Sequence, residues 1–205
     1  MTRIGVLVSG RGSNLQALID AVAEGRLPVK IVVVLSSRPG VAALNKAERA
    51  GIEAVAITPA EAPSREAYDY LLVAELKRRG VDLVCLAGFM RVLGPAFCNA
   101  FPNAVLNIHP ALLPSFPGVD AQQQAFDYGV RVTGVTVHLV TPELDAGPIV
   151  MQEAVPVLES DTASTLADRI LTVEHRLYPE AVRKIIAGGW HVDGRRVVFA
   201  PDGLR

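Results

Sequence analysis

Short apolar runs alternate along the chain with longer stretches in which apolar residues recur every three or four positions. The short runs are rich in β-branched residues, which is typical of buried parallel strands, and they cover residues 4–8, 31–35, 54–57, 83–87 and 105–108. The longer stretches predict helices over residues 14–23, 41–50, 64–79 and 94–100. This alternation predicts βαβ units, in which helices cover both faces of a parallel sheet.

The pattern changes after residue 130. Residues 132–140 and 148–157 are predicted to be extended and to add antiparallel strands to the sheet. Asp161-Thr162 is predicted to cap a long helix that ends near residue 187, and Asp193-Gly194 to turn a terminal hairpin. We therefore expect a single Rossmann-like α/β domain with a mostly parallel twisted sheet and antiparallel additions near its C-terminal part. The domain is predicted over residues 1–189, with a hairpin and tail over 190–205 packed on it.

The length and net charge of the chain limit the kinds of molecule that it is expected to bind. The chain has 205 residues and a formal net charge of −1, which gives no electrostatic footprint for nucleic acid or an anionic membrane. Its start enters an apolar strand without a charged leader, and no apolar run reaches transmembrane length. We expect a cytoplasmic protein that acts on small molecules, as a monomer or weak homodimer.

One strand carries a candidate catalytic pair. Asn107 and His109 stand two residues apart, and Pro110 biases His109 toward extended backbone. In a strand both side chains therefore project on one face. An amide donor beside a titratable imidazole suits a reaction in which an oxygen gains negative charge and a proton moves nearby. A buried structural histidine is the alternative interpretation of the same pattern.

A glycine-rich turn, residues 9–15, follows the first strand. The backbone amides of such a turn, together with the positive end of the following helix, favour a phosphate. Leu15 stands where a dinucleotide fingerprint has its third glycine, so NAD is not expected, and the spacing of a P-loop is also missing. A single phosphate on a small molecule fits the turn, although a purely structural role for the glycines stays open.

Two other chemistries fit the sequence less well. A hydrolase could use Ser9 or Ser13 with His109 and Asp145, but neither serine lies in the G-x-S-x-G motif of a nucleophile elbow. No metal site is expected, because the histidines are widely separated and lack zinc-ligand spacing; they are His109, His138, His175 and His191.

Several motifs together resemble the phosphoribosylglycinamide formyltransferase family, whose members use folate in purine synthesis. The resemblance spans about residues 3–190. Its motifs are Gly12-Ser13-Asn14-Leu15-Gln16, Ser64-Arg65-Glu66-Ala67-Tyr68-Asp69, Leu86-Ala87-Gly88-Phe89-Met90-Arg91, residues 106–114, Val137-His138, Asp145-Ala146-Gly147-Pro148 and Glu174-His175.

The resemblance implies a reaction and its catalytic residues. The amine of phosphoribosylglycinamide would attack the formyl group of 10-formyltetrahydrofolate directly, without a covalent enzyme adduct and without metal or NAD. Asn107 would donate to the oxyanion, and protonated His109 would stabilise it and act as a general acid. Asp145 is expected to raise the pKa of His109 and to keep it charged at neutral pH.

The resemblance also implies the binding residues. The substrate phosphate is expected on Gly12, Ser13 and Asn14, with Glu174 on the ribose or glycinamide part. Folate is expected to contact a larger set, with His138 as a supporting residue; the set is Arg65, Met90, Arg91, Val92, Leu93, Asn107, Val140, Thr141, Pro142, Glu143, Leu144 and Asp145.

Two positions depart from the family pattern. Asp120 replaces a histidine that many relatives carry, and Leu171 replaces a polar residue one turn before Glu174. Three functional alternatives stay open: a formyltransferase acting on another amine (an amino sugar nucleotide or methionyl-tRNA), a Ser/His/Asp hydrolase, and a binding module for a phosphorylated ligand.

Overall fold

Parallel strands form the sheet of the first unit of the chain, Met1–Asn107, in a computed structural model that describes residues 1–200. The strands lie in the order β3-β2-β1-β4-β5, and every neighbouring pair is parallel. Ile4 at the centre is in register with Ile31 on one side and Leu83 on the other, and all three are buried. The strands are β1 (Thr2–Val8), β2 (Val29–Ser36), β3 (Ala54–Ala56), β4 (Leu83–Leu86) and β5 (Val105–His109).

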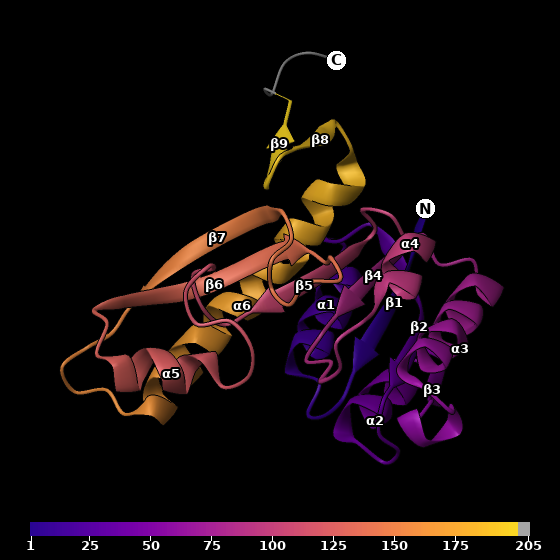
Figure 1. The fold of residues 1–205 in the computed structure, drawn as a ribbon, viewed down its shortest axis with the longest axis horizontal. Coiled ribbons are helices and arrows are strands. Elements are labelled where there is room, and N and C mark those ends of the chain that lie inside the picture. The colour runs from indigo at the N-terminus through magenta and orange to yellow at the C-terminus, as the bar shows by residue number, and fades with distance from the viewer. Residues whose placement is uncertain (201–205) are drawn as a thin grey trace. The chain divides into compact units, whose positions relative to one another are not determined.

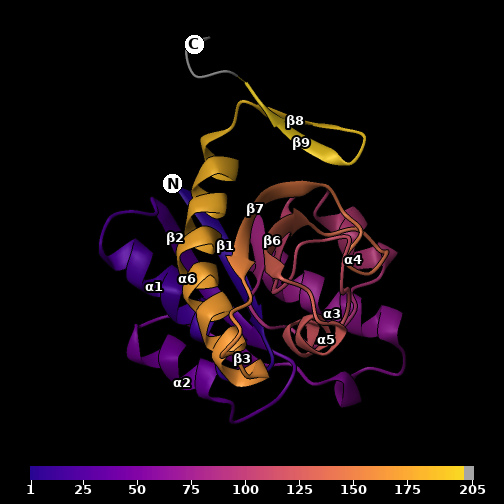
Figure 2. The same cartoon turned by 90° about the vertical axis from the view of Figure 1, so that its left-hand side faces the viewer.

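Helices cover both faces of this sheet. In the two views, α1 and α2 lie on one side of the strands and α3 and α4 on the other (Figure 1, Figure 2). Ser64 begins α3, because its hydroxyl accepts a hydrogen bond from the N–H of Ala67. The helices of this unit are α1 (Ser13–Ala23), α2 (Ala42–Arg49), the 3₁₀ helix η1 (Pro59–Glu61), α3 (Arg65–Arg78) and α4 (Pro95–Ala100).

Antiparallel pairing characterises the second unit, Ile108–Arg205. Its strands lie in the order β6-β7-β9-β8, with β6 antiparallel to β7 and β9 parallel to β7. Helix α6 packs along β6 and β7, and α5 contacts α6 (Figure 2). The elements are α5 (Ala121–Tyr128), β6 (Val132–Leu139), β7 (Ile149–Pro156), α6 (Ala163–Ala187), β8 (Trp190–Asp193) and β9 (Arg196–Phe199).

The predicted α/β class is confirmed, with parallel strands first and antiparallel strands in the C-terminal part. The terminal hairpin is also confirmed, and Thr162 caps the long helix as expected, accepting a hydrogen bond from the N–H of Thr165. The division into residues 1–189 and 190–205 stays a prediction, and residues 201–205 lie outside the described part. No helix within residues 1–200 is long and apolar enough to cross a membrane.

The sequence patterns missed two helices, η1 and α5. Helix α5 buries only Ala121 and Ala125, so its apolar periodicity is weak. Its N-cap residue, Asp120, has a left-handed backbone (φ 53°) and makes no side-chain cap. Asp120, the first departure from the family pattern, is therefore an exposed residue at the start of this helix.

Candidate active site

The end of β5 carries the predicted pair. The strand is continuous through both positions, so Asn107 and His109 leave it on the same face, as predicted. Asn107 is half-buried and His109 is 4% exposed. The bond that follows shortly after, Leu113-Pro114, is cis.

His109 belongs to the second unit, and both of its ring nitrogens face hydrogen-bond acceptors of that same unit. Nε2 donates to the carbonyl of Phe116 at 2.8 Å, and Nδ1 lies 3.5 Å from Oδ2 of Asp145. The carbonyl of Phe116 can only accept, so the Nε2 contact fixes a proton on that nitrogen. The ring is thereby held with Nδ1 toward the carboxylate.

Asp145 lies between two buried imidazoles. Its Oδ2 accepts a hydrogen bond from the N–H of Gly118 at 2.8 Å, and its Oδ1 lies 3.7 Å from Nε2 of His138. Nδ1 of His138 in turn donates to the carbonyl of Leu139 at 2.9 Å. The imidazole of His138 therefore lies beside the Asp145 carboxylate, and its supporting role stays a prediction.

Burial sets the charge states of this cluster. Burial alone would raise the pKa of Asp145, but the neighbouring His138 imidazole, the hydrogen bond from Gly118 and the proximity of His109 together lower it. Burial also lowers the pKa of His109 below 6.5, and this outweighs the opposing effects of Asp145 and Phe116. The expectation that Asp145 keeps His109 charged at neutral pH is therefore wrong, because desolvation lowers the pKa of the imidazole more than Asp145 raises it.

Side chains of β6 and β7 hold the segment that follows His109. The hydroxyl of Thr136 donates to the carbonyl of Ala111 at 2.7 Å and accepts from the N–H of Leu113 at 3.0 Å. Gln152 donates both to the carbonyl of Leu113 and to Thr136, each at 2.9 Å. These bonds fix the start of the loop that supplies Phe116 and Gly118.

The loop that carries Asp145 is closed tightly at its base. The N–H of Leu139 donates to the carbonyl of Pro148 at 2.9 Å, and a Cβ added to Gly147 would lie 1.8 Å from the carbonyl oxygen of Leu139. Arg195 of the terminal hairpin donates to the carbonyl of Ala146 at 2.9 Å. The residues of this loop predicted to bind folate are thus held from both ends.

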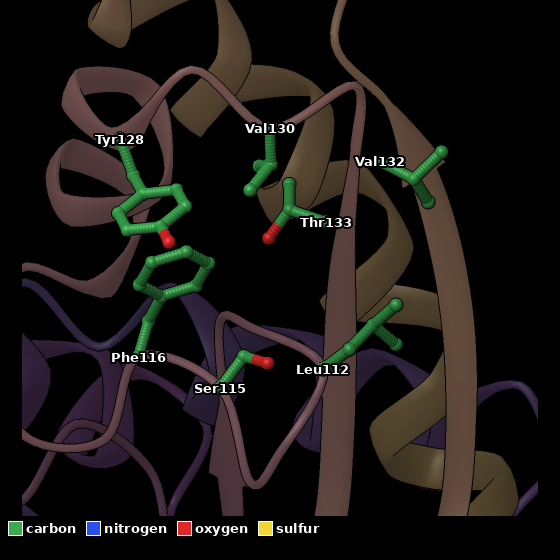
Figure 3. Close-up of a pocket in the computed structure, with 7 residues that line it drawn as sticks. All are labelled: Leu112, Ser115, Phe116, Tyr128, Val130, Val132 and Thr133. Atoms are coloured by element: carbon green, nitrogen blue, oxygen red, sulfur yellow. The ribbon is translucent and has the colours of Figure 1, made fainter.

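A cavity of about 360 Å³ lies beside the loop that follows His109. The rings of Phe116 and Tyr128 lie one above the other along one side of it, with centroids 5.7 Å apart (Figure 3). Its lining consists of Leu112, Ser115, Phe116, Tyr128, Val130, Val132 and Thr133. None of these residues was predicted to belong to the site.

The glycine-rich turn of the first unit has the expected geometry. Gly12 adopts a left-handed backbone (φ 69°), and a Cβ there would lie 2.6 Å from the Cβ of Ala43. Glycine is thus required both for conformation and for space. Helix α1 begins directly at Ser13, and its first turn, Ser13-Asn14-Leu15-Gln16, is uncharged, which leaves the positive helix end free for an anion.

Part of the predicted folate set meets in a second cavity, also in the first unit. This cavity has a volume of about 340 Å³ and brings Arg65 and Arg91 together with Val92. Met90 is 59% exposed, whereas Leu93 is 3% exposed and packs in the core. Pro59, Ser64 and Tyr68 complete the lining.

Glu174 lies on the buried face of α6. It is 5% exposed and follows Leu166 and Ile170 at four-residue intervals, so a carboxylate stands within an apolar stripe. Leu171, the second departure from the family pattern, lies one turn before it on a half-buried part of the helix.

Phe116, Gly118 and Tyr68 were not predicted as site residues from the sequence. Phe116 and Gly118 contact His109 and Asp145 through backbone atoms, so their residue types give no signal for these contacts. The Pro117-Gly118 pair is typical of a turn, and it could have indicated that a backbone N–H points into the site. Within residues 1–200, no group of three or more His, Cys, Asp or Glu side chains is arranged to hold a metal ion.

Comparison with known proteins gives matches over most of the chain. The family described as formyl transferase matches residues 2–182. The phosphoribosylglycinamide formyltransferase of Escherichia coli is 41% identical over 94% of this chain and 88% of its own. The solved structure of glycinamide ribonucleotide transformylase 1 from Symbiobacterium toebii is 53% identical, with a TM-score of 0.95, over 97% of this chain and 94% of that one.

A longer relative matches as well. The trifunctional purine biosynthetic protein adenosine-3 of Bos taurus is 47% identical over 91% of this chain, but the match covers only 18% of that protein. The chain therefore corresponds to one part of that relative.

Proposed function

Because the chain belongs to the formyl transferase family, as its motifs predicted, we propose that it acts on phosphoribosylglycinamide. It transfers the formyl group of 10-formyltetrahydrofolate to the amine of that ribonucleotide and releases phosphoribosyl-N-formylglycinamide and tetrahydrofolate. The observation that carries the choice of acceptor is the likeness to phosphoribosylglycinamide formyltransferases along nearly the whole chain. The reaction belongs to purine biosynthesis, and we assign it to the cytoplasm.

The reaction proceeds by direct attack of the substrate amine on the formyl carbon. The attack gives a tetrahedral intermediate, and its former carbonyl oxygen carries negative charge. Asn107 donates a hydrogen bond to this oxygen, which a preorganised amide does without reorganisation during the reaction. Collapse of the intermediate breaks the bond to the folate nitrogen, which takes up a proton.

The protonation of His109 depends on the negative charge that develops during the reaction. Burial lowers the pKa of its imidazole. Negative charge on the intermediate, together with the Asp145 carboxylate, favours the protonated ring. His109 therefore stabilises the transition state more than the ground state, which is the condition for raising turnover. Asp145 supplies the counter-charge and holds the water that relays the amine proton.

Each substrate has its own group of residues. The phosphate of the ribonucleotide binds the amides of Gly12, Ser13 and Asn14, and Glu174 contacts its ribose or glycinamide part. This assignment is supported by the left-handed backbone of Gly12 and the uncharged start of α1.

Folate binding uses the remaining predicted residues. Arg65 and Arg91 share one cavity, so two cations are available for the acidic end of the folate. Exposed Met90 and Val92 offer apolar surface to the pterin, with Leu93 packed beneath them. The loop 140–145 reads the edges of the ring through its backbone. The chain works as a monomer or weak homodimer and needs no metal.

A test of this proposal compares acceptors. Purified protein is mixed with 10-formyltetrahydrofolate and either phosphoribosylglycinamide, methionyl-tRNA or an amino sugar nucleotide, and the conversion of the folate is followed by absorbance. Turnover with the ribonucleotide alone is expected. Turnover with a different acceptor would retain formyl transfer and reassign the substrate, and hydrolysis without any acceptor would contradict the proposal.

A further inference from the structure

The segment 90–94 is fixed at its C-terminal end by a buried carboxylate. We propose that Asp69 is a positioning residue for the folate side of the site, because it holds Gly94 and thereby sets the path of the residues before it. This inference rests on the proposed function, since it assumes that Met90, Arg91 and Val92 contact the folate. Asp69 itself touches no substrate in this scheme.

Asp69 reaches Gly94 from a neighbouring helix. It lies on α3 and is 1% exposed, and its Oδ2 accepts a hydrogen bond from the N–H of Gly94 at 2.7 Å. The φ of Gly94 is −90°, which any residue adopts. A Cβ at this position would, however, lie 2.6 Å from Oδ2 of Asp69, so glycine is needed for the close approach.

The second oxygen of Asp69 shows that packing alone does not explain this residue. Oδ1 is buried and has no hydrogen-bond partner in the described part of the chain. Burial raises the pKa of Asp69, against the Gly94 hydrogen bond and the charge of Arg65. A buried carboxylate with an unsatisfied oxygen is costly. An apolar residue such as its neighbour Leu72 would fill the space at lower cost, so the hydrogen bond to Gly94 is what the carboxylate provides.

The other end of the segment is held in the same way. The N–H of Met90 donates to Oγ of Ser9 at 2.9 Å, and Ser9 is 3% exposed and lies 2.6 Å from Oγ of Ser37. Between the two fixed ends, Met90 and Val92 expose apolar side chains. Such an arrangement lowers the entropy that the segment would lose on binding a ligand.

Asp69 also lies near the cationic part of the folate set. Arg65 stands one helical turn before it, and the charge of Arg65 opposes the rise in the pKa of Asp69. Arg65 lines the cavity that contains Arg91 and Val92. Loss of the carboxylate would therefore disturb both the 90–94 segment and the arginine beside it.

The test measures tetrahydrofolate binding by calorimetry and the KM of each substrate for Asp69→Ala and Asp69→Asn. Asparagine retains an oxygen that can accept the Gly94 hydrogen bond, whereas alanine does not. Leu76→Val is the matched control, because Leu76 is fully buried on the same helix but its side chain lies toward Gly5. Thermal unfolding is recorded for every variant.

We expect Asp69→Ala to weaken tetrahydrofolate binding by about tenfold or more, which is the size expected for one charged hydrogen bond. The KM of the ribonucleotide should stay within about twofold, and Asp69→Asn should recover most of the affinity. If Leu76→Val weakens folate binding as much at an equal loss of Tm, or if Asp69→Ala leaves it unchanged, the proposal is overturned.

A second route keeps the proposal testable if Asp69→Ala does not fold. Gly94→Ala places a methyl group against Oδ2 of Asp69 and should weaken folate binding while leaving the KM of the ribonucleotide unchanged. Unchanged folate affinity in Gly94→Ala would overturn the role of this contact. Failure of the proposed function looks different: a wild-type protein that binds no tetrahydrofolate overturns both, whereas one that binds it and formylates another acceptor overturns only the acceptor.

Discussion

Asp145 combines an unusual backbone conformation with a buried negative charge. Its φ is 48°, a left-handed conformation that aspartate and asparagine tolerate better than other residues with a Cβ. Its carboxylate faces two imidazoles in a buried position. Asparagine can thus replace it without backbone strain, which allows the charge to be tested separately from the fold.

We expect Asp145→Asn to lower kcat by about 10²–10³, the range found when one preorganised electrostatic contact of a reaction is removed. The KM values of both substrates should change by less than about threefold, because the backbone of the loop is retained. Steady-state kinetics measure this effect, with Asp168→Asn on the exposed face of α6 as the control. Near-normal turnover of Asp145→Asn would remove the carboxylate from the mechanism.

His109 should make the protein sensitive to mild acid. Its folded pKa is lower than 6.5, so between pH 6.5 and that lower value the unfolded chain binds a proton that the folded protein does not. The free energy of unfolding therefore falls as pH decreases, by at most about 1.36 kcal/mol per pH unit. Asp145 acts at lower pH, because its folded pKa lies below 3.8.

His109→Gln removes this titration. From pH 7.5 down to pH 5 its Tm should fall less than that of the wild type, as measured by thermal unfolding in buffers of constant ionic strength. His191→Gln on the exposed hairpin is the control. If Tm falls equally with pH in His109→Gln and the wild type, burial does not lower the pKa of the His109 imidazole.

At the scale of elements, repeated patterns were predictable and single contacts were not. Strands and helices of the first unit emerge from β-branched runs and three-to-four-residue periodicity, and their ends lie within a few residues of the prediction. The loop after His109 depends instead on Thr136 and Gln152, which come from later strands. Residues that act across such distances, or through backbone atoms as Phe116 and Gly118 do, leave no local pattern.

The start of α1 is the element on which the ribonucleotide proposal depends. Ser13→Asp places a negative charge at the first residue of the helix. This charge stabilises the helix by about 0.3–1 kcal/mol through its interaction with the helix dipole, but it repels a phosphate. We expect an unchanged or raised Tm, a KM of the ribonucleotide raised by about tenfold or more, and an unchanged KM of the folate. Ser164→Asp makes the same change in the first turn of α6 and should leave both KM values unaltered. An unaltered ribonucleotide KM for Ser13→Asp would reassign the turn to structure.

For the molecule as a whole, the net charge of the sequence does not predict the charge states of individual buried groups. Which groups are desolvated depends on the folded neighbours of each residue. His109 was expected to be charged from its proximity to Asp145, but burial decides the matter. The terminal hairpin was predictable from Asp193-Gly194, whereas its contact with Ala146 was not.

The predicted division of the chain at residue 189 can be tested directly. The hairpin is in register with β7 at Ile149 and Arg196 only, so a chain ending at residue 189 should remain folded, with Tm lowered by less than about 4 °C. Loss of the Arg195 contact to Ala146 should raise the KM of the folate, and Arg195→Ala in the full chain should reproduce this change without the change in Tm. A truncated chain that does not fold would contradict the division.

The closed base of the Asp145 loop bears on how this protein could be redesigned or could diverge. No side chain fits at Gly147, because the carbonyl of Leu139 occupies the space. Natural variation and laboratory libraries should therefore find substitutions at the tip, from Thr141 to Leu144, far more readily than changes at the base. The base of the loop is therefore fixed in sequence while its tip can vary. Variants with a changed preference for the one-carbon donor should be sought among substitutions at the tip.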